Sequence, residues 1–239
     1  MDIQLGVIDM KIVNLALKIA LLGSLLGNSL LADAAKPVVV KTETTEYILD
    51  YKYPQDFQSK EVNAAIKDLI TVTENSFMGE LIEDAGTPAD APGKTSLTIK
   101  YNIPYQAKNA LSVRFIISTY HRGAAHPAEE VKVLNFINGH GVKLADLFKP
   151  GAEFLKPIAA YSAKEITAKN ISDAELISEG TAAKNKNYKT WYFTKKGIDV
   201  VFNTYQVAAY VYGEQVVAIP TSIFSAMLKP EIAKQLWGN

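Results

Sequence analysis

The chain has 239 residues, no cysteine, and 25 basic against 25 acidic side chains. This length suffices for one large domain or two small ones, each with its own core. The missing cysteine excludes disulfides, thiolate metal sites and cysteine nucleophiles, and the balanced charge argues against a nucleic-acid partner.

The first 34 residues predict an export signal. A basic start at Met10-Lys11 precedes an apolar run, and small residues occupy the two positions that a signal peptidase reads, Ala32 and Ala34. We expect cleavage after Ala34, with residues 1–9 as a mis-start or dispensable extension. The run 19–31 is short for a membrane span, which needs ~20 apolar residues. An uncleaved anchor is the alternative. The prediction is a periplasmic or secreted protein without a stable membrane span after cleavage.

The next ninety residues predict a strand, a helix and a hairpin. In residues 37–53, β-branched residues alternate with charged ones, which indicates one long strand near a sheet edge. Ser59 can cap a helix that runs to about Glu83, with apolar residues at 3/4/7 spacing. Apolar residues then alternate through 95–120, which predicts a hairpin. It leads into a turn at 119–127.

The remaining residues predict a second, similar set of elements. A strand covers 131–136, and an amphipathic helix covers 154 to about 169. The polar segment 171–187 is interpreted as a helix end plus a mobile loop. Three strands follow within 191–220, separated by turns at Gly197 and Gly213. Short helices end the chain, and Pro230 is well placed to start the last one.

These elements predict an α+β fold of two small mixed sub-domains, with antiparallel sheets each packed by a helix. The two halves meet near Pro127. We therefore expect a first domain over 37–127 and a second over 128–239.

A set of spaced residues resembles a known family. The motifs are Asn135-Phe-x-x-Gly139, Leu144-x-Asp146-Leu-Phe148, Phe193-x-x-x-Gly197, Phe202-Asn-x-Tyr205-x-x-Ala208-x-Tyr210-x-x-Gly213 and Ile219-Pro220. They resemble the C-terminal domain of the PdaC/RsiV-like family. Segment 38–127, with its Gly-Ala-x-His-Pro at 123–127, resembles the smaller domain that precedes it in that family.

The resemblance implies binding more than catalysis. In the peptidoglycan deacetylase of this family, catalysis belongs to an additional metal-dependent domain; in the anti-sigma factor, the domain is extracellular and binds lysozyme. We expect this chain to be an exported stand-alone copy without the deacetylase domain or the sigma-binding segment, and its sequence leaves its oligomeric state open.

The residues themselves favour no enzyme class, although the enzyme question stays open. The three histidines are His121, His126 and His140, and no His-Glu-x-x-His motif or Asp/His cluster supports a metal site. We expect His126 to structure its loop instead. No mature serine has the Gly-x-Ser-x-Gly pattern of a nucleophile elbow. Paired carboxylates such as Glu129 and Glu130 are interpreted as solvated charges. No catalytic residue, metal or cofactor is assigned.

The candidate ligand-binding residues lie in two segments. Tyr120, His121, Arg122 and His126 belong to the turn at 119–127, and Tyr205 and Tyr210 to the corner before Gly213. The tyrosines suggest either a binding platform or a buried corner with satisfied hydroxyls; we favour the buried corner. A small basic cluster comprises Lys184, Lys186, Lys189, Lys195 and Lys196. It suggests either an acidic partner or a solvated loop.

Three functions remain open at this point. The first is an exported, non-catalytic module of the bacterial cell envelope that recognises a lysozyme-like protein or a peptidoglycan-type glycan. The second is a small cell-wall-active hydrolase with a site at the interface of the two domains. The third is a structural envelope protein.

Overall fold

The computed structural model of the chain describes residues 35–83, 87–88 and 90–238. The predicted signal peptide lies outside these residues. They form an α+β fold with a six-stranded and a three-stranded sheet, so the expected class is confirmed. We call residues 35–141 the first unit and residues 144–238 the second unit. No helix in the described part of the chain has the length and apolar character needed to cross a bilayer.

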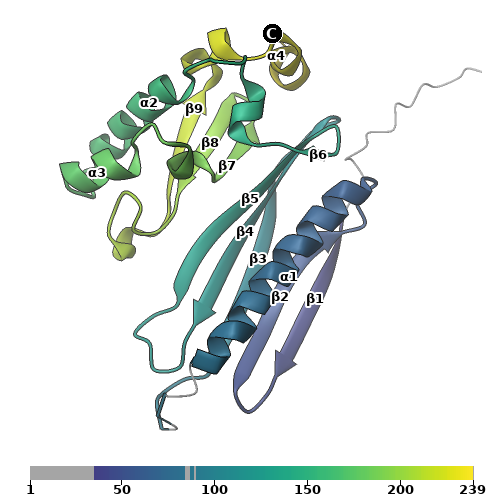
Figure 1. Cartoon of the computed structure of the whole chain (residues 1–239), viewed down its shortest axis with the longest axis vertical. Coiled ribbons are helices and arrows are strands. Elements are labelled where there is room, and N and C mark those ends of the chain that lie inside the picture. The colour runs from purple at the N-terminus through teal and green to yellow at the C-terminus, as the bar shows by residue number, and fades with distance from the viewer. Residues whose placement is uncertain (1–34, 84–86, 89, 239) are drawn as a thin grey trace, which may run out of the picture.

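The first unit is a long sheet covered by one helix (Figure 1). Its strands lie in chain order, β1 to β6. Every neighbouring pair is antiparallel except β2 with β3, which are parallel. The sheet is therefore mixed, not antiparallel as expected, because helix α1 connects β2 to β3 as a crossover. The elements are β1 (Lys36–Glu43), β2 (Tyr47–Gln55), α1 (Lys60–Glu83), β3 (Thr95–Gln106), β4 (Ala110–Tyr120), β5 (Ala128–Ile137) and β6 (His140–Gly141).

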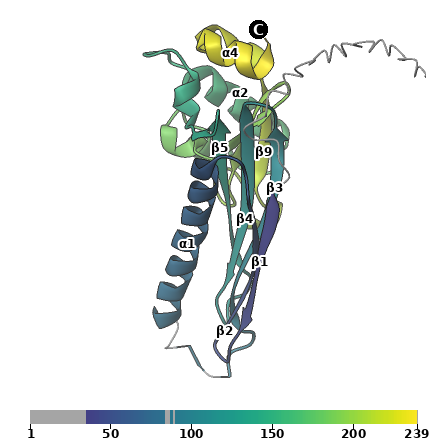
Figure 2. The ribbon, with the colours of Figure 1, turned by 90° about the vertical axis from the view of Figure 1, so that its right-hand side faces the viewer.

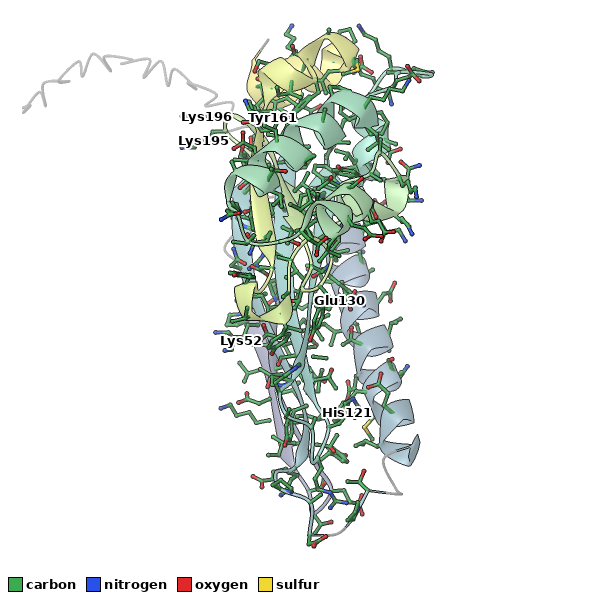
Figure 3. The ribbon with its side chains drawn as sticks, turned by 90° about the vertical axis from the view of Figure 1, so that its left-hand side faces the viewer. Lys52, His121, Glu130, Tyr161, Lys195 and Lys196 are labelled. Atoms are coloured by element: carbon green, nitrogen blue, oxygen red, sulfur yellow. The ribbon has the colours of Figure 1, made fainter. Side chains whose placement is uncertain are left out.

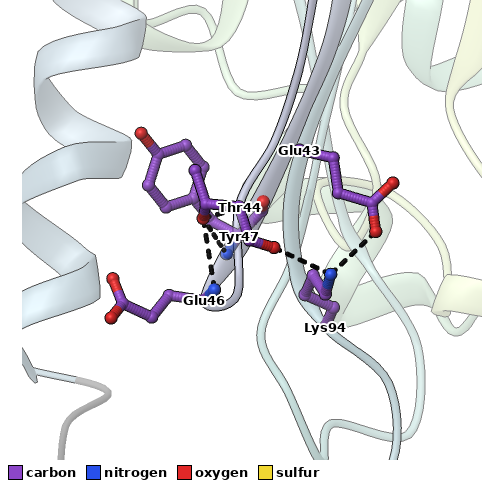
Figure 4. A network of polar contacts seen from close by, with 5 residues as sticks. All are labelled: Glu43, Thr44, Glu46, Tyr47 and Lys94. Atoms are coloured by element: carbon purple, nitrogen blue, oxygen red, sulfur yellow. Dashed lines mark hydrogen bonds and ion pairs between the residues drawn. The ribbon is translucent and has the colours of Figure 1, made fainter.

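The single strand predicted over 37–53 is wrong, because the chain turns back after Glu43 (Figure 4). The Thr44 side chain makes this turn: its Oγ1 accepts hydrogen bonds from the N–H groups of Glu46 and Tyr47 at 3.1 and 3.0 Å. Lys94 fastens the turn from outside, since its Nζ lies 2.7 Å from Glu43 Oε1 and 2.8 Å from the Thr44 carbonyl. Local side-chain bonds of this kind end a strand without glycine or proline.

Helix α1 lies along one face of the first sheet (Figure 2). Ser59 caps it as expected, with its Oγ 3.3 Å from the Val62 N–H. The apolar stripe of the helix, including Val62, Ile66 and Phe77, is buried against alternate residues of β2, β3 and β4. The apolar face of the helix, which repeats every 3.6 residues, packs on the sheet face formed by every second strand residue, and together they form the first core. The helix and the β3–β4 hairpin predicted from the sequence are thus confirmed.

The second unit forms its own core over the upper end of the first sheet (Figure 1). Helix α2 packs on β9, and the rings of buried Trp191 and Phe193 meet edge to face. Trp237 makes the same kind of contact with Phe193 and with Phe224. Pro230 opens α4 as expected. The elements are η2 (Leu144–Leu147), α2 (Leu155–Ala168), α3 (Ala174–Gly180), η3 (Asn185–Tyr188), β7 (Trp191–Thr194), β8 (Gly197–Phe202), η4 (Tyr210–Tyr212), β9 (Gln215–Pro220), η5 (Thr221–Ile223), η6 (Ser225–Met227) and α4 (Pro230–Trp237), where η marks a 3-10 helix.

The segment 171–187, predicted as a helix end plus a mobile loop, contains α3 and most of η3, joined by a short turn. Asp173 caps α3, accepting from the Leu176 N–H at 2.8 Å. The Asn187 amide then donates to the carbonyls of Glu179 and Ala182, at 2.9 and 3.1 Å. The polar residues that suggested a loop therefore satisfy the backbone of α3 and η3.

Strand β5 connects the two units. It follows the domain boundary predicted at residues 127–128, yet it pairs with β4 from Ala128 to Ile137. Its Phe136 belongs to the first core and its Ile137 to the second. The preceding residue, buried Asn135, links the two units: it accepts from the Ser112 hydroxyl at 2.6 Å and donates to the Trp191 carbonyl at 2.7 Å. One strand thus contributes to both cores.

Candidate functional site

Tyr120 and Arg122, two of the candidate ligand-binding residues, form hydrogen bonds with the loop that precedes β3 and with its first residue. The Tyr120 hydroxyl donates to the Pro92 carbonyl at 3.3 Å, and its ring covers Gly93. The Arg122 guanidinium donates to the Thr87 carbonyl at 3.1 Å, and its backbone N–H donates to Thr95 Oγ1 at 3.0 Å. These contacts fasten the segment before β3 to the end of β4.

The three histidines take separate partners. His121 Nε2 lies 3.4 Å from Glu80 Oε2, beside the lower end of α1 (Figure 3). His140 Nδ1 lies 2.6 Å from Glu61 Oε2 near the start of the same helix. His126 contacts the second unit. Within the described residues, no three His, Cys, Asp or Glu side chains converge on a point where a metal ion could bind.

His126 and the tyrosines form an aromatic cluster where the two units meet. The rings of His126 and Tyr210 stack with centroids 3.8 Å apart and planes at 21°. The Tyr205 ring also contacts Tyr210, with ring centroids 5.7 Å apart. Tyr212 follows in the same 3-10 helix and is 48% exposed. We call His126, Tyr205, Tyr210 and Tyr212 the aromatic corner.

The aromatic corner is fixed to the first unit by backbone-directed hydrogen bonds. The Tyr210 hydroxyl donates to the Pro127 carbonyl at 3.0 Å. Asn203 accepts from the Val131 N–H at 2.6 Å and donates to the Val131 carbonyl at 3.3 Å. From the other side, the Gln206 amide donates to the carbonyls of Gly180 and Asn187, at 3.1 and 3.0 Å. Hydrogen bonds therefore hold the loop on both sides, while Tyr205 within it stays exposed.

The buried-corner interpretation is wrong for Tyr205 and right for the hydroxyl of Tyr210. Tyr205 is 59% exposed, and Val211, which follows Tyr210, is 82% exposed. Tyr205 also has φ +68°, a left-handed conformation that bulky side chains rarely adopt. Such strain persists only where the surroundings impose it, and it is concentrated at functional positions. Tyr205 is therefore an exposed residue with a strained backbone in a loop that hydrogen bonds hold in place.

A polar cluster lies beside the aromatic corner, in the interface between the units. Arg114 of β4 forms an ion pair with Glu214, which directly follows Gly213. Tyr192 and Asp199 face each other across β7 and β8 and are hydrogen-bonded. Burial raises the pKa of Asp199, while the Tyr192 hydroxyl opposes part of that rise. Burial, with Asp199 beside it, raises the pKa of Tyr192 to about 12.

A cavity of about 660 Å³ lies on the other side of β5, between α1 and the second unit. Its apolar wall includes Ala65, Leu144 and Trp191, and its polar rim includes Lys143 and Lys189. We call it the interface cavity. Sequence reasoning missed it, because its wall combines residues from seven separate elements, α1, β5, β6, η2, α2, η3 and β7. Only the basic cluster around Lys184 to Lys189 pointed in its direction.

Residues 40–129 match the family described as Deacetylase PdaC, and residues 145–222 match the Protein of unknown function family DUF3298. The chain is 28% identical over 195 residues to the peptidoglycan-N-acetylmuramic acid deacetylase PdaC of Bacillus subtilis (strain 168). This match covers 79% of the chain but only 40% of the length of that relative.

Two crystal structures share the fold across both units. A DUF3298 family member from Bacteroides fragilis superimposes with a TM-score of 0.58 at 16% identity, covering 85% of this chain and 98% of that one. A DUF3298 family protein from Pseudomonas aeruginosa PAO1 gives 0.60 at 12% identity, covering 84% and 97%. The family matches to residues 40–129 and 145–222 confirm the expected order of a PdaC domain followed by a DUF3298 domain.

Proposed function

We propose that this chain, which joins a PdaC domain to a DUF3298 domain, is a non-catalytic binding module of the bacterial cell envelope. Its ligand is a peptidoglycan-type glycan, and the aromatic corner is the contact surface. The observation that supports this function best is Tyr205, exposed and strained within a loop that is otherwise fixed.

The chemistry of the aromatic corner suits a sugar. The face of an aromatic ring is electronegative, and the C–H groups on one face of a pyranose ring are weakly electropositive. Rigid tyrosines supply this contact area with little loss of side-chain entropy and leave a hydroxyl for polar contacts. The relative named as a peptidoglycan deacetylase supports the same choice of ligand, since its similarity to this chain spans both units.

The proposed location is the periplasm or the cell exterior. It depends on the apolar run 19–31 and on the small residues before Ala34. Expression of the full chain in a bacterium tests it: the exported protein should begin at residue 35 by mass spectrometry. A protein that keeps residues 1–34 in the membrane fraction would instead support the uncleaved anchor.

A co-sedimentation assay with purified peptidoglycan tests the ligand. Wild-type protein should be retained. Tyr205→Gly, which removes the ring and relieves the left-handed strain, should bind about 5–10-fold more weakly, since an aromatic contact contributes ~1–1.5 kcal/mol. Its melting temperature should not fall, because glycine adopts φ +68° freely.

The matched control is Val72→Ala, which removes an exposed apolar side chain from α1, far from the aromatic corner in sequence. This variant should bind like wild type. Failure of folded wild-type protein to bind peptidoglycan, or equal binding by Tyr205→Gly, would contradict the glycan proposal. Binding to lysozyme in place of peptidoglycan would identify a protein ligand.

A second candidate, a small cell-wall-active hydrolase, is favoured by the polar cluster at the interface. Asp199 and Glu214 are carboxyl groups in different environments, one partly buried and one paired with Arg114. Such differences can separate an acid from a base. Release of soluble fragments from peptidoglycan by wild type, lost in Asp199→Asn and Glu214→Gln, would support hydrolysis. Wild type without any release would exclude it.

A further inference from the structure

We propose that the interface cavity binds a short acidic peptide in an extended conformation, which pairs with the free edge of β5 at Val133. This site lies apart from the aromatic corner, and its ligand chemistry differs from that of a glycan. The inference does not rest on the proposed function.

The outer edge of β5 is closed on both sides of Val133. Asn203 takes the N–H and C=O of Val131, and the Asn135 carbonyl accepts from the Val142 N–H at 2.8 Å. Backbone groups of an antiparallel strand point to the two sides alternately, in steps of two residues. The N–H and C=O of Val133 therefore point outward too.

Val133 lines the interface cavity. Among the described residues, no loop or side-chain group forms a hydrogen bond with its outward N–H or C=O. Between Val131 and Asn135 the open edge is roughly 13 Å long, at ~3.3 Å per residue. This length admits one short extended segment. One residue of a peptide offers the matching acceptor and donor, which is how a strand adds to a sheet edge.

The interface cavity has the size and lining for apolar side chains of such a peptide. Its volume of about 660 Å³ falls within the range of ligand sites. Leu144, Tyr188 and Trp191 are buried residues of the second core that also reach its wall. Ala65 on α1 is small and leaves the opposite wall open.

The charge of the rim selects an acidic ligand. Lys143 and Lys189 line the cavity and are exposed, and neighbouring Lys184 and Lys186 extend the basic surface along η3. In the part of the chain that the structure describes, none of these four ammonium groups has a carboxylate within ion-pairing distance. Asp146 is the acidic group of the lining, and its Oδ2 already accepts from the Lys143 N–H.

The test is a titration of the full chain with the peptide acetyl-Val-Glu-Val-Glu-Val amide. Binding should change the fluorescence of Trp191 and slow hydrogen exchange at the Val133 amide. The lysine counterpart, acetyl-Val-Lys-Val-Lys-Val amide, should bind at least tenfold more weakly. Equal binding of the two peptides, or no binding of either, would overturn the proposal.

Paired variants test the two contacts separately. Lys143→Glu with Lys189→Glu should weaken binding at least tenfold. Lys195→Glu with Lys196→Glu, in the β7–β8 turn (Figure 3) and outside the cavity lining, should leave binding unchanged. If both double variants weakened binding equally, the effect would come from the net charge of the protein, and the proposed site would be wrong.

Val133→Pro removes the outward N–H at an edge position that tolerates proline. This variant should bind the acidic peptide more weakly. Its melting temperature is measured to show that it is folded. Peptides methylated on single backbone nitrogens test the same bonds in unmodified protein: at least one position should abolish binding. Equal binding of all methylated peptides would refute edge pairing. Tyr205→Gly should bind the acidic peptide like wild type, which separates this site from the glycan proposal.

Discussion

Two asparagine side chains of the described residues, Asn203 and Asn63, take the place of a backbone hydrogen-bond partner. Asn203 bonds both backbone groups of Val131, and Asn63 bonds both backbone groups of Phe57, at 3.0 and 2.7 Å. The side-chain amide carries a donor and an acceptor in the arrangement of a peptide group. Single residues therefore satisfy backbone that regular structure leaves open.

Asp199 makes stability depend on pH in a direction opposite to that of an ion-paired carboxylate. Burial raises its pKa above the ordinary value of 3.8, so the folded state binds more protons than the unfolded chain just above that pH. The free energy of unfolding should fall as pH rises through this window. Asp199→Asn should therefore be more stable than wild type at pH 7 and lose that advantage near pH 3.5, as measured by urea unfolding.

Tyr192→Phe is the companion variant for this measurement. It removes the hydroxyl that lowers the pKa of Asp199, so the fall in stability with pH should become larger than in wild type. Parallel stability profiles for Asp199→Asn and wild type between pH 3.5 and 7 would show that burial of this carboxyl has no net effect.

Among the elements, α3 sets the position of the loop that carries the aromatic corner. Its last residue, Gly180, lies so close to the loop that an added Cβ would be 1.9 Å from the Gln206 carbonyl oxygen. The backbone carbonyl of Gly180 in turn accepts a hydrogen bond from the side-chain amide of Gln206. The helix and the loop are therefore fitted to each other at backbone distance.

Gly180→Ala should lower the free energy of unfolding by about 1–3 kcal/mol, the usual cost of overpacking. It should also weaken retention on peptidoglycan by displacing the aromatic corner. Gly79→Ala is the matched control, since Gly79 lies inside α1 with nothing within 4 Å of the added Cβ. That variant should gain about 0.5–1 kcal/mol in chemical unfolding, because alanine favours a helix over glycine. A stable Gly180→Ala would refute the close fit.

Across the whole molecule, buried hydrogen bonds couple the two cores. The Ser112 hydroxyl donates to Asn135 and accepts from the Phe193 N–H at 3.1 Å, while Asn135 donates to Trp191. The network runs from β4 and β5 of the first unit to β7 of the second. A buried network of this kind tolerates little change, because each lost partner leaves a desolvated polar group.

Asn135→Ala should lower the free energy of unfolding by about 2–4 kcal/mol, since it leaves the Trp191 carbonyl and the Ser112 hydroxyl without this partner. Circular dichroism and tryptophan fluorescence should shift together, because both cores lose the same bond. Ser76→Ala, which removes an exposed hydrogen bond to Glu80, should stay within about 0.5 kcal/mol of wild type. Separate transitions by the two probes would show that the cores are independent.

The elements predicted from the sequence are those that patterns between nearby residues determine. Alternation and helical spacing located α1, α2, the β3–β4 hairpin and the three strands of the second sheet. The turn at Thr44 and the cap at Asp173 were missed, because they depend on single side-chain bonds that many threonines and aspartates do not make.

The sites were only partly predictable for the same reason. His126, Tyr205 and Tyr210 were singled out by residue type, and the structure brings them together. Tyr120 and Arg122 were singled out in the same way, but their polar groups are used within the first unit. Which donors remain free depends on loop packing, and the interface cavity depends on how seven elements meet.

The double role of β5 limits how such a protein can be divided and recombined. A cut between residues 127 and 128 would remove a ten-residue strand from the first sheet and expose the edge of β4. A cut after residue 141 would take Asn135 and Ile137 away from the second core. A gene fusion or domain exchange at either point would therefore leave one of the two units without part of its sheet or core. We expect the two units to be inherited together.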